Sequence, residues 1–178
     1  PIKSSAASMC IRDRGYKIDY SNGNGFFNTQ EELDEYLSHT KYSFGTPGLG
    51  DFKYMDLNDD GVVDEKDQVP LRYTKIPRIT YGFTLGLDYK GIDFTIFFQG
   101  VSKYSHFSGT TQNVYEWTKE GTYYNYHKRA WTKERYENGE KITYPALHTG
   151  DNVNTRANDF FVFDRSFIRL KNIELGYT

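Results

Sequence analysis

Acidic and amide side chains recur between residues 56 and 67 at the spacing of an EF-hand-type calcium loop. Asp56, Asn58 and Asp60 hold the first, third and fifth positions, and a glycine follows at the sixth, where such loops turn sharply. Calcium takes six to eight hard oxygen ligands, and this spacing wraps them around one ion. The sequence therefore predicts a structural Ca2+ site whose ligands are Asp56, Asn58, Asp60, the Val62 carbonyl, Asp64 and Asp67.

Three departures from the usual loop predict weak binding. Asp67 stands at the twelfth position, where a longer glutamate usually contributes both oxygens. The loop occurs once, and no clear helix precedes it. Extracellular calcium modules function with dissociation constants of about 0.1–1 mM, so such a site could still order its surroundings. The alternative interpretation is an acidic turn that binds no ion.

The elements around this loop are predicted to be strands. Residues 79–100 alternate apolar with small or polar residues on both sides of Lys90 and Gly91. Period-two alternation predicts strands, and a glycine at the second tip position tolerates the positive φ of a two-residue hairpin turn. Pairing about this tip places Phe83 opposite Phe98, and the same register matches polar with polar positions on the other face.

The pattern alone does not show whether the apolar face contacts lipid or the core of a soluble protein. Tyr81 and Tyr89 stand at the margins of the first strand with Phe and Leu between them, which is typical of a membrane barrel strand. The strand also has about the 9–11 residues that a tilted membrane strand needs. A hairpin in a soluble β-sandwich shows the same alternation. The Gly, Thr, Asp and Gln of the other face favour the barrel, because water-exposed sheets usually carry Lys, Glu and Arg.

The rest of the chain supplies one helix, one strand and two long segments. Thr29 and Glu32 have capping-box spacing and predict a short helix that ends near His39. Residues 167–178 alternate again and predict a third strand, whereas residues 101–158 show no sustained period. Bacterial barrels have short periplasmic turns and long outer loops. The tip of hairpin 79–100 is therefore predicted to be periplasmic, and residues 15–78 and 101–166 extracellular.

The first 14 residues are treated separately. Residues 4–14 resemble the translation of a sequencing adapter, and we exclude residues 1–14 from fold reasoning as a non-native leader. Cys10, the single cysteine, lies there, so neither a disulfide nor a redox site is predicted. The chain starts without Met and stops at Thr178 within a strand, which leads us to expect a truncated piece of a longer protein.

Composition excludes several classes of function. The chain of 178 residues has a net charge of −2 and no basic tract, so nucleic-acid binding is not predicted. Its 16 Tyr and 13 Phe indicate a β-rich, interface-rich protein. The four histidines lack zinc-type spacing, and neither a nucleophile elbow nor a phosphate loop is present. We therefore predict that the chain is not an enzyme.

Several segments, taken in order, resemble the SusC/RagA family of TonB-dependent outer-membrane transporters. The resemblance covers roughly residues 15–178 and is low across 101–158. The most specific segments are Tyr81-Gly82-Phe83 through Tyr89-Lys90-Gly91-Ile92-Asp93 to Phe98-Gln99-Gly100, and Ser166-Phe167-Ile168-Arg169-Leu170-Lys171-Asn172-Ile173-Glu174-Leu175-Gly176-Tyr177-Thr178.

This resemblance implies an all-β fold with one short helix, in which antiparallel strands of a transmembrane β-barrel, incomplete in this chain, carry long extracellular loops. It further implies an outer-membrane location and the import of oligomeric nutrients, either glycans or peptides. The implied partners are outer-membrane lipid, a SusD-like surface lipoprotein and TonB, which would bind through a missing N-terminal region.

A second interpretation remains open from the sequence. The chain could be a soluble calcium-stabilised β-module for carbohydrate binding or adhesion, and the two interpretations differ in whether the apolar face of the hairpin is covered. In either case, four aromatic side chains of the long segment could stack on sugar rings, or could instead pack the segment onto itself. These are Tyr123, Tyr124, Tyr126 and Trp131.

Overall fold

The computed structural model describes residues 14–73, 76–107, 124–148 and 152–177. These residues divide into two compact units. The first unit extends to Leu71 and includes Phe107–Val162, and the second comprises Arg72–His106 and the chain from Phe163 onward.

Short and long strands dominate the described residues, as an all-β chain requires. The short strands are β1 (Arg14–Gly15), β2 (Lys41–Tyr42), β3 (Val62–Val63), β4 (Val69–Pro70), β7 (Ser105–Phe107) and β8 (Val162–Asp164). The long strands are β5 (Ile79–Tyr89), β6 (Ile92–Ser102) and β9 (Phe167–Tyr177). The α-helices are α2 (Gln30–His39) and α4 (Lys133–Glu137). None of the helices described is long and apolar enough to cross a membrane.

Two details differ from the predicted all-β fold. Helix α4 is a second short helix, and the sequence reasoning did not predict it. Strand β2 pairs with β3 in parallel, whereas the pairs β1–β4, β5–β6 and β6–β9 are antiparallel. Both exceptions involve only a few residues, so the predicted fold class is confirmed.

The second unit contains the predicted hairpin in the predicted register. Phe83 lies opposite Phe98, and their rings stack with centroids 4.9 Å apart. Lys90 and Gly91 form the tip with φ values of +49° and +81°. Positive φ at both tip residues is the requirement of a type I′ turn, whose twist matches that of the flanking strands. Strand β6 continues to Ser102, two residues beyond the predicted end of the hairpin.

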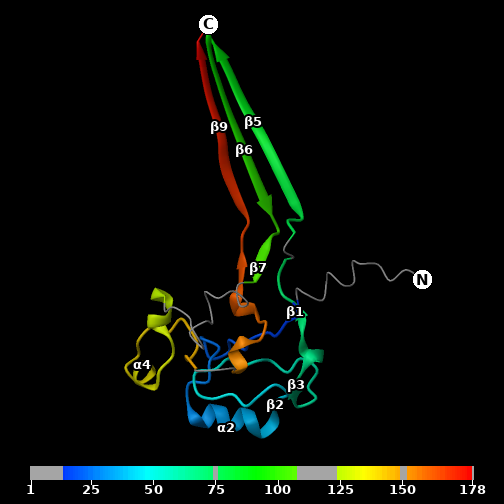
Figure 1. Ribbon diagram of the computed structural model, residues 1–178, viewed down its shortest axis with the longest axis vertical. Helices are drawn as coiled ribbons and strands as arrows, with labels where there is room; N and C mark the ends of the chain where they lie inside the picture. The colour runs from blue at the N-terminus through cyan, green and yellow to red at the C-terminus, as the bar shows by residue number, and fades with distance from the viewer. Residues whose placement is uncertain (1–13, 74–75, 108–123, 149–151, 178) are drawn as a thin grey trace, which may run out of the picture. The chain divides into compact units, whose positions relative to one another are not determined.

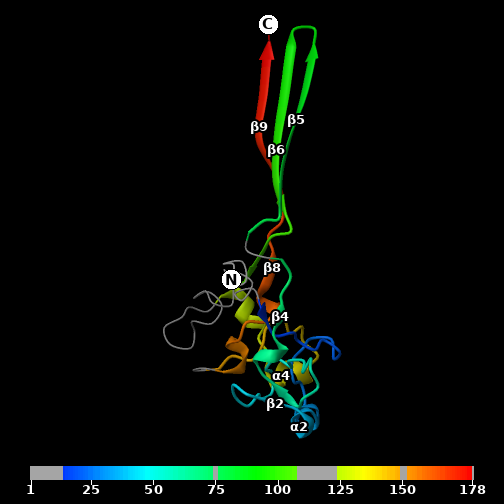
Figure 2. The same cartoon turned by 90° about the vertical axis from the view of Figure 1, so that its right-hand side faces the viewer.

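Strand β9 completes a three-stranded antiparallel sheet in the order β5-β6-β9 (Figure 1). Ile92, the first residue of β6, pairs with Tyr177 at the end of β9. The hairpin tip and the C-terminal end of β9 therefore lie at the same end of the sheet (Figure 2).

A β-bulge interrupts the pairing of β6 with β9. Phe97 pairs with Asn172 and Phe98 with Leu170, so Lys171 has no partner on β6. An extra residue in one strand exchanges the faces on which the residues beyond it lie. The bulge therefore brings Leu170 and Ile168 onto the face that also carries Ile173, although strict alternation would place Leu170 with Asn172.

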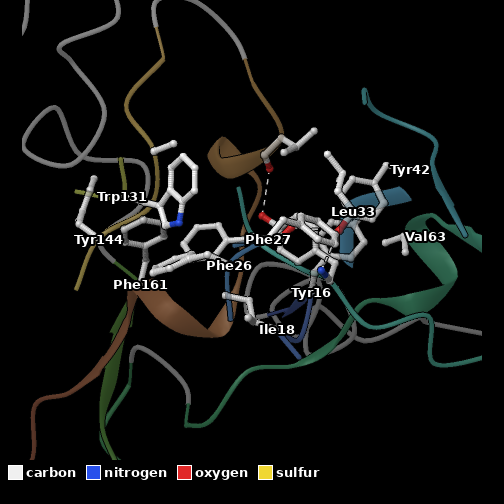
Figure 3. Close-up of a cluster of buried hydrophobic side chains, with 14 of the residues drawn as sticks. Tyr16, Ile18, Phe26, Phe27, Leu33, Tyr42, Val63, Trp131, Tyr144 and Phe161 are labelled. Carbon is white, nitrogen blue, oxygen red and sulfur yellow. Dashed lines mark hydrogen bonds between the residues drawn. The ribbon is translucent and has the colours of Figure 1, made fainter. Parts of the chain in front are cut away.

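The first unit has a hydrophobic core of its own, in which aromatic residues predominate. Figure 3 shows Trp131, Tyr144 and Phe161 on one side of Phe26, with Tyr42 on the other side. This core joins parts of the two segments, 15–78 and 101–166, that the sequence analysis treated as long loops. In the described residues, large parts of both segments are packed structure. The sequence did not reveal this packing, because irregular backbone carries buried side chains at no fixed spacing.

Helix α2 begins where its sequence predicts. The Thr29 hydroxyl accepts a hydrogen bond from the Glu32 amide at 3.2 Å and so satisfies a backbone donor of the first turn. The Glu32 carboxylate reaches back to the amide of Asn28 at 3.1 Å. Leu33 is buried against the core, and the Tyr36 hydroxyl donates to the Tyr54 carbonyl at 2.5 Å. These contacts hold helix α2 against the core of the first unit.

A glycine allows Trp131 to pack into this core. Gly50 has φ +82°, and a Cβ atom built on it would overlap the ring of Trp131. Both backbone groups of Gly50 form hydrogen bonds. Its amide donates to the Phe27 carbonyl at 2.7 Å, and its carbonyl accepts from the Ala146 amide at 2.9 Å. Only glycine satisfies both this backbone conformation and this close approach.

Candidate functional site

One face of the three-stranded sheet, here called the apolar face, carries almost exclusively hydrophobic side chains. Directly paired residues share a face, so the register assigns its members without ambiguity. They are Ile79, Tyr81, Phe83, Leu85, Leu87 and Tyr89 of β5, Ile92, Phe94, Ile96 and Phe98 of β6 with the small residues Gly100 and Ser102, and Ile168, Leu170, Ile173, Leu175 and Tyr177 of β9.

The apolar face is exposed. Leu85 and Leu87 of β5 are 58% and 64% exposed, and Leu175 of β9 is 75% exposed. The β6 members Phe94, Ile96 and Phe98 are half-buried, because β5 and β9 flank them on both sides. Monomeric soluble proteins rarely expose contiguous apolar patches larger than a few hundred Å2. Coverage of this face separates the two sequence-based interpretations, and among the described residues the face remains exposed.

Aromatic residues lie toward both ends of the apolar face. Tyr89 and Tyr177 lie at the hairpin end, and Tyr81 lies near the other end of β5. The ring of Tyr81 lies over its cross-strand partner Gly100, where a Cβ atom would overlap it. Aliphatic residues such as Leu85 and Ile96 fill the middle. This distribution matches the aromatic girdles that flank the apolar band of membrane strands.

The opposite face of the sheet is mixed and is here called the polar face. It presents Thr84, Thr95, Gln99, Arg169, Asn172 and Glu174, together with the directly opposed pair Asp88 and Asp93. Phe97 is an exception at its centre, and its ring lies 3.2 Å from the position of a Cβ atom on Gly82. Directly opposed carboxylates are unfavourable unless water or a cation lies close. The polar face is therefore suited to an aqueous surrounding.

The acidic loop of residues 56–67 lies in the first unit, and its predicted ligands differ in their present roles. Asp67 is fully buried, and its Oδ1 accepts from the amides of Leu57 and Asn58 at 2.8 and 3.3 Å. Its Oδ2 accepts from the Asp64 amide at 2.9 Å. Both oxygens of Asp67 thus bind the backbone of the loop. A lysine, which the sequence reasoning did not consider, supplies positive charge to the other carboxylates.

This lysine, Lys66, places its ammonium group 3.0 Å from Asp60 Oδ2 and 3.5 Å from Asp64 Oδ2. The contact lowers the pKa of Asp60 and raises the pKa of Lys66. Within the residues that the structure describes, no three carboxylate, imidazole or thiol groups converge as a ready-made metal site. Asp60 and Asp64 would therefore have to release Lys66 to share one ion with Asp56.

The aromatic side chains that were predicted to stack on sugar rings have different surroundings. Tyr124 and Tyr126 are each 41% exposed, and their rings are nearly parallel, with an interplanar angle of 6° and centroids 5.6 Å apart. Trp131 is only 7% exposed, and its indole nitrogen donates to Asn28 Oδ1 at 3.2 Å. Tyr123 lies outside the described residues. Burial makes Trp131 a core residue in this structure and leaves the two tyrosines as the accessible pair.

The structure also brings the buried Asp51 against the half-buried His148, a pair that was not predicted from the sequence. Asp51 Oδ1 lies 2.5 Å from His148 Nε2 and accepts from Asn154 Nδ2 at 2.7 Å, while its Oδ2 accepts from the Gly48 amide at 2.7 Å. Asp51 is 3% exposed, and the hydrogen bond with this carboxylate raises the pKa of His148 above its usual value. The two residues are 97 positions apart in the chain, so no local pattern could have indicated the pair.

Comparison with known proteins adds one relative. Over 133 residues, the chain is 32% identical to the TonB-dependent receptor P26 of Formosa agariphila. This homology supports the TonB-dependent receptor family. The aligned stretch covers 72% of the chain and 12% of the receptor, so the chain spans about an eighth of the length of that relative. No protein-family model matches the chain.

Proposed function

We propose that this chain forms part of the membrane barrel and outer loops of an outer-membrane TonB-dependent transporter of the SusC/RagA type. The observation that carries the proposal is the apolar face, which extends over three strands and is exposed. Homology to a TonB-dependent receptor supports the same function. Burial of apolar surface stabilises by roughly 25 cal/mol per Å2, so lipid contact would remove a large cost that this face has in water.

The edges of the sheet are consistent with a larger barrel. Strands β5 and β9 are the two outer strands of the sheet. In lipid, unpaired backbone groups at such edges cost several kcal/mol each, so β5 and β9 would need further strands beside them. We infer that neighbouring strands of the complete transporter pair with both edges.

Loop length gives the orientation. The two-residue tip at Lys90 and Gly91 would face the periplasm, and the first unit would be an extracellular module. The polar face would then line the lumen. TonB would contact a part of the transporter outside residues 1–178.

The cargo and the surface partner follow from the SusC/RagA assignment. We infer the import of oligomeric nutrients, either glycans or peptides, with a SusD-like lipoprotein as partner and no enzymatic step in this chain. Tyr124 and Tyr126 would offer a flat surface on which a sugar ring can stack. In a glycan-binding assay on the intact complex, Tyr124→Ala should weaken binding, whereas unchanged affinity would remove this role.

The test uses the full-length protein that contains this chain. An affinity tag should recover it from the outer-membrane fraction together with a surface lipoprotein in about equal amount. Recovery from that fraction without a lipoprotein would remove the SusC/RagA assignment and leave a TonB-dependent receptor of another type. Recovery from the soluble fraction would favour the second candidate, a calcium-stabilised β-module for carbohydrate binding or adhesion.

A further inference from the structure

An unsatisfied oxygen marks the acidic loop as a place for a cation. Asp56 Oδ1 is buried, and it accepts no hydrogen bond from any residue that the structure describes. Its partner oxygen Oδ2 accepts from the Gly61 amide at 2.7 Å, which holds the carboxylate in place. A buried carboxylate oxygen without a donor loses its hydration without compensation, and such atoms commonly bind an ion or a water molecule.

The backbone of β3 adds a second oxygen donor to the loop. Strand β3 pairs with β2 through the carbonyls of Gly61 and Val63, which accept from Lys41 and Ser43 at 2.9 and 3.1 Å. Successive backbone groups of a strand alternate in direction, so the Val62 carbonyl points away from β2. The amide of Val62 also turns away from β2 and donates to Asp60 Oδ1 at 3.0 Å. The Val62 carbonyl is thereby available at the position that a calcium loop requires.

Charge in the loop is strongly unbalanced. Residues 56–67 contain six carboxylates and one ammonium group, that of Lys66. Lys66 lies against Asp60 and Asp64 but is 68% exposed, and exposed ion pairs contribute only about 0–1 kcal/mol. A divalent ion can therefore displace it at little cost.

We propose that this loop binds one calcium ion through Asp56, Asn58, Asp60 and the Val62 carbonyl, with Asp64 bound directly or through water. Water completes the six to eight oxygens that calcium prefers. Asp67 closes the loop from outside the coordination sphere, because both of its oxygens bind backbone amides. Lys66 occupies the carboxylates of Asp60 and Asp64 in the absence of the ion and competes with it.

Calcium titration of the full-length protein that contains this chain, in detergent and after chelator treatment, tests this site. Calorimetry should show one binding event with a dissociation constant of about 0.1–1 mM, and about 10 mM calcium should raise the Tm on the order of 5 °C. Asp56→Asn and Asp60→Asn should each weaken binding about tenfold or more, because each removes a charged ligand. Asp59→Asn is the matched control, since Asp59 lies between ligand positions, and it should leave the affinity within about twofold.

Two further variants separate the roles of Lys66 and Asp67. Lys66→Gln should tighten calcium binding about three- to tenfold, because it removes the competing charge. Asp67→Asn should lower the Tm by the same amount in chelator and in calcium, as expected of a residue that closes the loop. Near-UV circular dichroism in chelator should show the same fold for Asp56→Asn, Asp60→Asn and the wild type.

The proposal fails if no heat of binding is detected up to about 10 mM calcium. It also fails if Asp59→Asn weakens binding as much as Asp56→Asn does, since that result indicates diffuse attraction by an acidic surface. A loss of stability in Asp67→Asn that occurs only in calcium would contradict the closing role and would make Asp67 a ligand.

Discussion

Leu170 of β9 lies opposite Phe98 of β6, and the next pair toward the hairpin tip skips one residue of β9. The skipped residue is Lys171. The hydrophobic residues Ile168 and Leu170 of β9 lie before the bulge and have even numbers, whereas those after it have odd numbers. Because of the bulge, both sets lie on the same face of the sheet. The bulge accommodates the extra residue Lys171 and so keeps the apolar face, on which the proposed function rests, continuous.

Deletion of Lys171 should therefore be tolerated. Without the bulge residue, Leu170 and Asn172 become neighbours and fall on opposite faces by simple alternation. Deletion of Ile173 is the control, because it moves Asn172 into the apolar face opposite Ile96. Heat-modifiable migration of the full-length protein on a gel should persist in the first variant and be lost or reduced in the second. The reverse order would show that the bulge itself is required.

The two faces of β5 should respond differently to charge. Leu85→Arg should destabilise the protein in lipid by about 2–4 kcal/mol, the cost of arginine on the lipid side of a membrane strand near the midplane. Thr84→Arg, one residue away on the polar face, should change stability much less. Urea unfolding from lipid vesicles measures both variants. Equal losses would argue against two different surroundings for the two faces.

The first unit should depend on glycine at position 50. Gly50→Ala should lower the free energy of unfolding by about 2–5 kcal/mol, because the new methyl group strains the backbone and overlaps the ring of Trp131. Gly23→Ala is a matched control, since Gly23 has φ +92° but no described atom within 4 Å of the added carbon. It should cost only the backbone strain of about 1–2 kcal/mol. Tryptophan fluorescence during urea unfolding compares the two, and a similar loss in both would contradict the packing role.

Stability of the first unit should decrease as the pH rises above neutrality. In the folded protein, the hydrogen bond with Asp51 raises the pKa of His148 above its ordinary value of about 6.5. Protonated His148 therefore stabilises the fold fully below about pH 6.5, and this contribution is lost as the pH rises through the folded-state pKa. The remaining contacts of Asp51, with Gly48 and Asn154, are uncharged. The Tm should fall between about pH 6 and pH 8 in the wild type, and less in His148→Gln; equal pH profiles would remove the effect.

The sequence was sufficient to predict the hairpin. It was insufficient to predict features that depend on contacts with distant parts of the chain. Alternation and a glycine at the tip fix the register of Phe83 against Phe98, because both faces of the strand constrain it. The bulge at Lys171 could not be predicted from β9 alone, since it is defined by the phase of β6. Helix α2 was recognisable because its capping residues, Thr29 and Glu32, act locally.

The candidate sites divide in the same way. Spacing predicted the acidic loop, but it could not show that Asp67 binds backbone amides or that Lys66 lies on two carboxylates. The burial of Trp131 depends on Gly50, which is far away in sequence. Asp51 and His148 come from different segments and meet only through the core between them. Contacts of this kind depend on tertiary packing, which carries no period in the sequence.

Collision accessibility of spin labels tests the central claim most directly, namely that the apolar face contacts lipid. Labels are attached at Leu85 and Ile173 on the apolar face and at Thr84 and Glu174 on the polar face of the full-length protein in lipid vesicles. The first two labels should be relaxed mainly by oxygen, which dissolves in the bilayer, and the other two by a water-soluble nickel chelate. Stronger relaxation of the apolar-face labels by the nickel chelate, or their protection from both reagents, would contradict the account.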